Sequence, residues 1–248
     1  MSAAFLLSGY DGLAETLANM RRAGVARVVL LSSSAAPGGD LGNAVARYHI
    51  LSEQAVRESG LAWTFLQPNS FMTNTFQWIP QLREGDVVRA PFADVAISTI
   101  DPGDVGAVAA RGLVDDELEG RALRLSGPEA LLPAGRVRIH GAALGRELRF
   151  EVQSNEEARA EMSAAMPAEY VDAFFSFLRR GDGRRDHGST HGVRDPRARA
   201  RLVRALGRGE RGVVSVSAIR SVRRWPQRRT CGHGVSFLDR LVVSGLTR

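Results

Sequence analysis

Residues 28–74 decide the fold, since they read VVLLSSS at 28–34, YHILSEQAVRESG at 48–60 and LAWTFLQPNSFMTN at 61–74. The first segment is a run of β-branched residues and leucines that ends in serines, which is typical of a buried strand. The second segment has the apolar period of an amphipathic helix, and the third is again an apolar strand. Strand, helix and strand in this order predict a βαβ unit of a parallel sheet.

Polar residues stand where both predicted strands of this unit end. Ligands of open parallel sheets lie just beyond the carboxyl ends of the strands. The sequence therefore predicts a site formed by residues 32–34, which are serines, and residues 68–71, which read PNSF. The alternative is that the serines only end a strand and begin a turn. We favour the site, because both polar segments fall at the same edge of the predicted sheet.

The rest of the chain up to residue 178 continues to alternate between strands and helices. Its unalternating apolar runs predict strands covered on both faces, and stretches bounded by Asp, Pro and Gly predict helices. The expected strands are residues 3–7, 26–31, 62–66, 87–89, 95–99, 121–125 and 147–152. The expected helices are residues 11–23, 41–59, 74–82, 101–113, 135–144, 155–165 and 168–178. This pattern predicts an α/β fold with a parallel sheet flanked by helices.

Composition excludes several classes of protein. The chain has 248 residues, of which 44% are hydrophobic, and this is enough for a packed core. Its apolar runs are far shorter than the roughly 20 residues of a membrane span, and its N-terminus lacks the basic segment of a secretory signal. The single cysteine, Cys231, excludes an internal disulfide, and its spacing from the histidines fits no standard zinc site. We therefore expect a cytoplasmic protein without a metal ion.

Charge divides the chain into two parts. All 33 basic residues are arginine. Residues 1–178 hold 15 arginines and 22 acidic residues, a net charge of −7, whereas residues 179–248 hold 18 arginines and 5 acidic residues, a net charge of +13. This change predicts a folded domain over residues 1–178 and an Arg-rich tail over residues 179–248. We expect the tail to be disordered or an out-of-frame translation, because GC-rich DNA read out of frame yields excess arginine.

Nucleic-acid binding is the rival interpretation of this tail. Arginines recur at residues 194, 197, 201, 204 and 208, a spacing that places them on one face of a helix. Such a face can bind phosphates without sequence preference. The tail contains no recognised nucleic-acid motif, however, and it follows a domain of net negative charge. We therefore do not expect nucleic acid as a partner.

Three motifs carry a family resemblance. The pattern SExxxRxSGLxWTxLxPxxFMxN begins at Ser52, IDPGDVGAVAA covers residues 100–110 and LSGPEAL covers residues 125–131. In this order and composition, the chain resembles the NmrA-like group of atypical short-chain dehydrogenase/reductases over residues 3–178. The resemblance implies a partial Rossmann-like sheet, with a small C-terminal substrate-side region before the irregular basic tail.

The same resemblance implies a function and a set of site residues. It implies binding of NADP(H) or NAD(H) and hydride transfer to a small apolar, quinone-like acceptor. The alternatives are a non-catalytic NAD(P) sensor that regulates a protein partner, and an inactive truncated fragment. The implied cofactor contacts are Leu7, Ser8, Ser32, Ser33, Ser34, His49, Pro68, Asn69, Ser70 and Phe71. The implied substrate pocket contains Met72, Asn74, Phe76 and Trp78, although such residues are more often core.

The start of the chain departs from the family's pattern. Family members begin with a strand and a glycine-rich GxxGxxG turn, which brings a pyrophosphate to a helix N-terminus. This chain starts on residues 3–7, which resemble a later strand of the family. We therefore expect the nicotinamide half of the cofactor site without its pyrophosphate half, as a late start of the reading frame would produce.

The proton-relay residues also depart from the pattern. Short-chain dehydrogenases use a Ser, a Tyr and a Lys four residues after the Tyr. Here Ser52 follows Tyr48 at that spacing, and the chain contains no lysine. His49 stands where family members place a lysine, and it can bond a ribose hydroxyl but is no permanent cation. The alternative interpretation, which the sequence supports equally well, is that His49 is a partly buried polar residue. We therefore assign no catalytic residue from the sequence.

Overall fold

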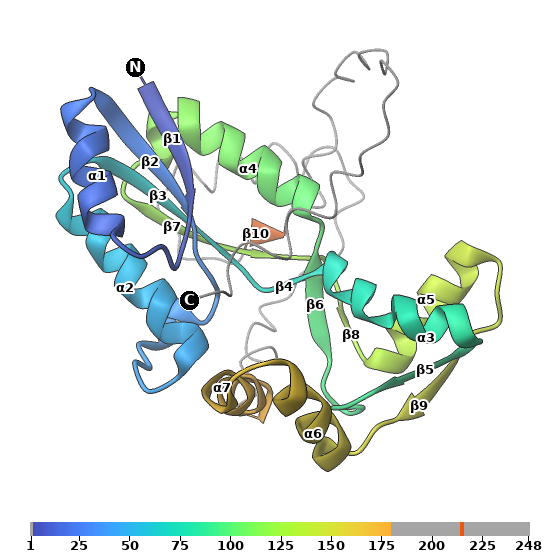
Figure 1. The fold of residues 1–248 in the computed structure, drawn as a ribbon. Helices are drawn as coiled ribbons and strands as arrows, with labels where there is room; N and C mark the ends of the chain where they lie inside the picture. The colour runs from blue at the N-terminus through green and yellow to red at the C-terminus, as the bar shows by residue number, and fades with distance from the viewer. Residues whose placement is uncertain (1, 180–213, 216–248) are drawn as a thin grey trace, which may run out of the picture.

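The computed structural model describes residues 2–179 and 214–215, and these residues form the fold in Figure 1. Within them, five strands form one parallel sheet in the order β1-β2-β3-β7-β10. The strands are β1 (Ser2–Leu7), β2 (Val25–Leu31), β3 (Ala62–Pro68), β7 (Arg121–Ser126) and β10 (Val214–Ser215). The predicted parallel α/β sheet is therefore confirmed, including the βαβ unit of residues 28–74.

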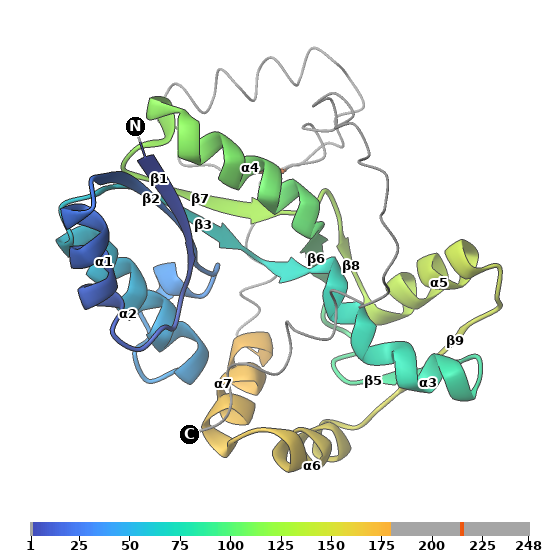
Figure 2. The same ribbon diagram turned by 45° about the horizontal axis from the view of Figure 1, so that its top comes forward.

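Helices cover both faces of this sheet. Helices α1 (Leu13–Arg22) and α2 (Ala44–Glu58) lie on one face and α4 (Pro102–Val114) lies on the other (Figures 1 and 2). Val28 and Leu30 belong to the core beneath α1 and α2, whereas Val29 belongs to the core beneath α4. All three side chains are fully buried. This explains why the apolar run of β2 does not alternate with polar residues.

A second, smaller group of elements follows the carboxyl ends of the sheet (Figure 2). Its strands are β4 (Ser70–Phe71), β5 (Val87–Ala90), β6 (Ile97–Ile100), β8 (Ala130–Leu131) and β9 (Arg149–Val152). Its helices are the 3-10 helix η2 (Met72–Trp78), α3 (Ile79–Glu84), α5 (Pro133–Leu144), α6 (Asn155–Ala165) and α7 (Ala168–Arg179). The core of this group contains Trp78, Val88 and Val137.

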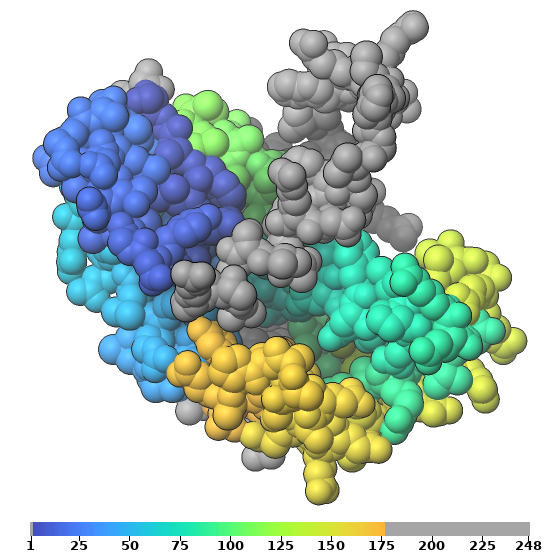
Figure 3. Space-filling view, in the orientation of Figure 1, coloured from blue at the N-terminus to red at the C-terminus, as the bar shows by residue number. Residues whose placement is uncertain are grey.

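Helix α7 returns to the main sheet and packs on α2, so the two groups are joined (Figure 3). The Asn43 side chain donates to the carbonyl of Ala173 at 3.0 Å. Arg47 and Glu169 form an ion pair of 2.9 Å. Helix α7 therefore covers the N-terminal half of α2, which carries Tyr48 and His49.

Capping groups decide where the helices begin. The Asn43 side chain accepts from the amide of Ala46 at 2.9 Å, so α2 starts three residues later than the predicted residue 41. Helix α1 starts after Gly12, whose φ of 70° is left-handed, rather than at the predicted Asp11. Asp101 accepts from the amide of Gly103 at 2.7 Å and begins α4 as predicted. Ser154 and Glu157 form a capping box that begins α6 at the predicted residue.

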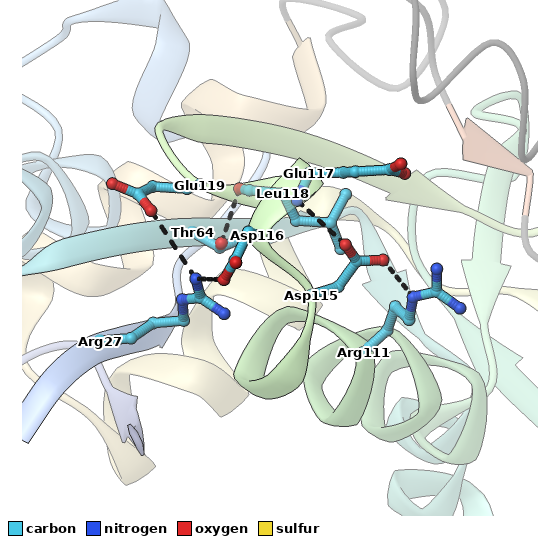
Figure 4. A network of polar contacts seen from close by, with 8 residues as sticks. All are labelled: Arg27, Thr64, Arg111, Asp115, Asp116, Glu117, Leu118 and Glu119. Atoms are coloured by element: carbon cyan, nitrogen blue, oxygen red, sulfur yellow. Dashed lines mark hydrogen bonds and ion pairs between the residues drawn. The ribbon is translucent and has the colours of Figure 1, made fainter. Parts of the chain in front are cut away.

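The amino end of the sheet is closed by a network of charges (Figure 4). Arg27 on β2 is 3% exposed and forms ion pairs with Asp116 and, at 3.7 Å, with Glu119. Thr64 on β3 donates to the carbonyl of Leu118 at 2.7 Å. The turn η3 (Asp116–Leu118) is thereby fastened across the amino ends of β2 and β3.

Several predictions concern residues beyond the described ranges. Most of the predicted Arg-rich tail, including Cys231, lies outside the described residues. Among the helices that the structure describes, none is long and apolar enough to cross a membrane.

Candidate functional site at the carboxyl ends of the strands

Side chains from four segments meet at the carboxyl end of the main sheet. The Ser34 hydroxyl, after β2, donates to the Asn69 side-chain oxygen at 3.4 Å. The Asn69 side-chain nitrogen donates to the hydroxyl of Ser98 on β6 at 3.0 Å, and the Ser98 hydroxyl bonds that of Ser126 on β7. A row of hydroxyls and one amide therefore crosses the carboxyl ends of β2, β3 and β7 and the beginning of β6.

Backbone bonds hold this row in place. The amides of Ser32 and Ser34 donate to the carbonyls of Leu66 and Pro68 at 2.7 and 2.9 Å. The amide of Asn69 donates to the carbonyl of Leu125 at 2.9 Å. The strands thus stay paired up to the polar residues, and the side chains are fixed by the sheet rather than by a flexible loop.

Beneath this row lies a buried carboxylate that the sequence analysis did not select. Glu53 on α2 is 4% exposed. Its Oε1 accepts from the Ser32 hydroxyl at 2.5 Å and from the Gln67 side-chain nitrogen at 2.8 Å. Its Oε2 accepts from Arg57 at 2.9 Å. Glu53 and Arg57, which both belong to the motif that begins at Ser52, therefore connect α2 to the ends of β2 and β3.

Ser33 has the local contacts of a turn residue. Its hydroxyl accepts from the amide of Ala35 at 3.2 Å, and its carbonyl accepts from the amide of Ala36 at 3.1 Å. The chain turns here into the short 3-10 helix η1 (Ala36–Gly38). Of the three serines, Ser34 therefore faces the row of polar side chains, Ser32 is fastened beneath it, and Ser33 supports the turn.

The end of β1 lies beside α2. Ser8 donates from its hydroxyl to the carbonyl of Leu31 at 2.8 Å, while Leu7 is 40% exposed. The amide of Gly9 donates to the hydroxyl of Ser52 at 3.0 Å. Gly9 and Gly12 both have left-handed φ angles, as glycines of phosphate-binding turns often do. However, the amide of Gly9 already donates to Ser52, and the carboxylate of Asp11, between the two glycines, would repel a phosphate. We therefore assign no phosphate to this turn.

The rings of Tyr48 and His49 lie side by side on α2, with centroids 4.1 Å apart and their planes tilted by 38°. The Nδ1 atom of His49 is buried and has no hydrogen-bond partner among the described residues. Burial lowers the pKa of His49 to about 4, so its ring is neutral at pH 7. Burial, and then the charge of Tyr170, raise the pKa of Tyr48. Neither side chain is charged at pH 7.

The predicted pocket residues separate into exposed and buried ones. Met72 and Phe76 on η2 are 43% and 54% exposed, while Trp78 is 2% exposed and packs in the core with Val88 and Val137. Asn74 donates to the hydroxyl of Ser70 at 3.1 Å, and Phe71 packs against the core beneath α4. Met72 and Phe76 are therefore the exposed apolar residues of this segment, and Trp78 is a core residue.

Sequence reasoning missed Glu53, Gln67, Ser98 and Ser126. One signal pointed to Glu53, which lies seven residues after Ala46 and three before Val56, both buried on α2. An acidic residue within such an apolar stripe is a candidate for a buried polar contact. Ser98 and Ser126 have no comparable local signal. Among the described residues, no group of His, Cys, Asp and Glu could hold a metal ion.

Three curated proteins are similar to the chain in sequence. The chain is 40% identical over 158 residues to (4-alkanoyl-5-oxo-2,5-dihydrofuran-3-yl)methyl phosphate reductase of Streptomyces griseus, covering 64% of this chain and 56% of that protein. It is 33% identical over 183 residues to the uncharacterized oxidoreductase YesF of Bacillus subtilis, covering 72% of this chain and 60% of that protein. It is 36% identical over 123 residues to an NAD(P)H azoreductase of Xenophilus azovorans, covering 49% and 43%.

Solved structures show the same fold. The chain superposes on the NADPH-dependent quinone oxidoreductase QOR2 of Escherichia coli with a TM-score of 0.60 and 19% identity, covering 73% of this chain and 67% of that one. In sequence and in fold, the chain is therefore similar to the NmrA-like group of atypical short-chain dehydrogenase/reductases. Its sheet also matches that of triphenylmethane reductase of Citrobacter sp., with a TM-score of 0.58, 16% identity and coverage of 74% and 68%. No family model matches the chain. The chain spans between about two fifths and three fifths of the length of these curated relatives.

Proposed function

We propose that this chain forms the nicotinamide side of an NAD(P)H-dependent oxidoreductase that reduces a small apolar, quinone-like acceptor. The observation that carries the proposal is the row Ser34, Asn69, Ser98 and Ser126 at the carboxyl end of the main sheet. An exposed apolar surface, Met72 and Phe76, follows directly after it. A polar row beside an apolar surface suits a ligand with one polar and one apolar part.

The donor set suits the ribose and carboxamide of a nicotinamide nucleotide. Such a ligand offers hydroxyl groups that both donate and accept, and Ser34 and Asn69 can do the same. The buried Nδ1 atom of His49, which lacks a partner among the described residues, supplies one further position for a ribose hydroxyl. When bound, the reduced nicotinamide would supply the hydride, and the chain's own residues would orient it.

These residues include no charged proton relay. His49 is neutral at pH 7 because burial lowers its pKa to about 4, and Tyr48 keeps its proton because burial raises its pKa. The chain has no lysine to lower the pKa of a tyrosine. In this proposal, the proton that accompanies the hydride to the acceptor therefore comes from water.

The relatives support the reaction class. The Streptomyces griseus protein is called a reductase, and the Xenophilus azovorans protein is called an NAD(P)H azoreductase. The Escherichia coli structure was solved with NADPH and is called a quinone oxidoreductase. Azo compounds and quinones are conjugated, largely apolar acceptors, which the exposed Met72 and Phe76 suit.

A non-catalytic NAD(P) sensor that regulates a protein partner is the second candidate. The neutral His49 and the absence of lysine favour it, because they leave the site without a relay of its own. A third outcome is that this polypeptide binds no cofactor.

Titration of the purified chain with NADPH, followed by nicotinamide fluorescence and thermal shift, tests the proposal. We expect saturable binding that Asn69→Ala weakens, and NADPH oxidation with a quinone or azo dye. Binding without oxidation over a panel of quinones, azo dyes and aldehydes would favour the sensor. No binding at millimolar NADPH would exclude both readings for this polypeptide.

A further inference from the structure

One carboxylate connects three elements beneath the candidate site. Glu53 reaches from α2 to the last residues of β2 and β3, where Oε1 accepts from Ser32 at 2.5 Å and from Gln67 at 2.8 Å. Ser32 and Gln67 are 3% and 4% exposed, so water does not replace these bonds. Each of them lies within two residues of a member of the polar row, Ser34 or Asn69.

The negative charge of Glu53 is balanced from the solvent side. Arg57, one helical turn later, pairs with Oε2 at 2.9 Å, and its side chain is 47% exposed. Its guanidinium also lies over the ring of Phe65 at 4.7 Å and over that of Trp63 at 5.3 Å. Because Arg57 keeps these contacts and its access to water, loss of the Glu53 charge leaves no buried cation behind. A variant at Glu53 is therefore expected to fold.

We propose that Glu53 is the positioning residue of this site: its carboxylate sets the distance between the ends of β2 and β3, and thereby the Ser34–Asn69 contact. A carboxylate that accepts two bonds on one oxygen holds both donors at fixed positions, and charge-assisted bonds are the stronger kind. Without it, a buried hydroxyl and a buried amide compete for a weaker acceptor, and the strand ends separate. The inference rests on the proposed function only for its effect on NADPH; the strand ends can be observed without any ligand.

The first experiment measures hydrogen exchange of the Ser32 and Ser34 amides in the ligand-free protein. These amides bond to Leu66 and Pro68 across the two strand ends, so they report separation directly. Glu53→Gln is compared with Glu58→Gln, which removes an exposed carboxylate bonded to Gln54 on the same helix. We expect exchange about tenfold faster in Glu53→Gln, the factor that corresponds to one buried hydrogen bond, and no change in Glu58→Gln.

A stability-matched control separates positioning from a general structural role. Val56→Ala shortens a fully buried side chain that packs in the apolar core beneath α1 and α2, and it is expected to lower the melting temperature. We expect Val56→Ala to leave the Ser32 and Ser34 amides protected against local exchange. Equal acceleration in Val56→Ala and Glu53→Gln would overturn the proposal, as would unchanged exchange in Glu53→Gln.

The second experiment compares NADPH dissociation constants for the same proteins. Glu53→Gln is expected to bind NADPH about tenfold more weakly, while Glu58→Gln and Val56→Ala bind as the parent does. If the parent binds no NADPH, the proposed function fails and the exchange measurement alone decides the role of Glu53. If exchange accelerates while NADPH binding is unchanged, Glu53 does not position the site.

Discussion

The two ends of the main sheet each hold a buried charge, and the partners of these charges differ. At the amino end, Arg27 is paired with the carboxylate of Asp116 on the turn η3 and with that of Glu119, which directly follows this turn. At the carboxyl end, Glu53 is held mainly by neutral groups, the Ser32 hydroxyl and the Gln67 amide, with Arg57 at the rim. The buried charge at the amino end holds a turn against the sheet, whereas the buried charge at the carboxyl end holds the ends of two strands together.

This difference supports the proposal that a ligand binds at the carboxyl end. At the amino end, Arg27 and its carboxylate partners neutralise one another, and they hold the turn η3, which connects α4 to β7. At the carboxyl end, the buried charge supports a row of hydroxyl and amide groups that can exchange bonds with a ligand. The buried Nδ1 of His49, unpartnered among the described residues, lies on the helix that carries Glu53. A row of neutral hydroxyl and amide groups, supported by a buried carboxylate, distinguishes the candidate site from the amino end.

The largest effect is expected from Gly127→Ala at the carboxyl end. A Cβ atom at Gly127 would lie 2.0 Å from the carbonyl oxygen of Thr99, and a backbone oxygen cannot move away as a side chain can. We expect a loss of at least about 3 kcal/mol in the free energy of unfolding, or no folding. Urea denaturation followed by circular dichroism measures it.

Gly106→Ala is the matched control for this prediction. A Cβ atom at Gly106, within α4, has open space around it, so alanine is expected to stabilise the protein by about 0.5–1 kcal/mol. Equal effects of the two substitutions would show that the absence of a side chain at Gly127 is not what allows β6 to lie so close to the end of β7.

A second effect at the carboxyl end depends on pH. Burial lowers the pKa of His49 from its ordinary 6.5 to about 4. Between these values the unfolded chain binds a proton that the folded chain does not, so stability falls as the pH falls through this window and is flat above it. The full effect is roughly 3 kcal/mol. His49→Gln should lose less stability than the parent between pH 7 and pH 4; parallel stability curves would contradict the burial of this ring.

The long, capped elements could be predicted from the sequence, and the contacts between distant segments could not. Residues 155–165 form the predicted helix because Ser154 and Glu157 provide a local capping box. Residues 168–178 and the strands of the βαβ unit likewise follow from local periodicity. The pairing of Ser98 with Ser126 joins residues far apart in the chain, and neither residue carries a sign of it.

Resemblance and physical reasoning contributed differently to the candidate site. The position of residues 32–34 at a strand end is confirmed, but only the structure shows that Ser34, Ser33 and Ser32 have different contacts. Trp78 belongs to the core because Val88 and Val137 reach it from β5 and α5, and such tertiary neighbours leave no trace in local sequence. The contacts of a cofactor with His49, Asn69 and the neighbouring residues stay predictions.

A smaller effect is expected when the amino end is altered. Asp116→Ala leaves the Arg27 guanidinium buried with Glu119 alone, at 3.7 Å. Because Asp116 itself is 82% exposed, we expect a loss of about 1–2 kcal/mol rather than the larger cost of breaking a fully buried pair. Asp172→Ala, in the exposed pair with Arg159, is the control and should change stability by about 0.5 kcal/mol or less. NADPH binding should be unchanged in both; weaker binding in Asp116→Ala would remove the distinction between the two ends.

The smallest effect on stability, and the most selective effect on function, is expected at Phe76. Its side chain is 54% exposed beyond the carboxyl ends of the strands, so Phe76→Ala should change the free energy of unfolding by about 0.5 kcal/mol or less. If Phe76 contacts the acceptor, the same substitution should raise KM for a quinone and leave the dissociation constant of NADPH unchanged, because Phe76 is not among the proposed cofactor contacts. Phe76→Leu keeps an apolar surface and should restore part of the affinity for the quinone. An unchanged KM in Phe76→Ala would place the acceptor elsewhere and leave the polar row as the whole of the site.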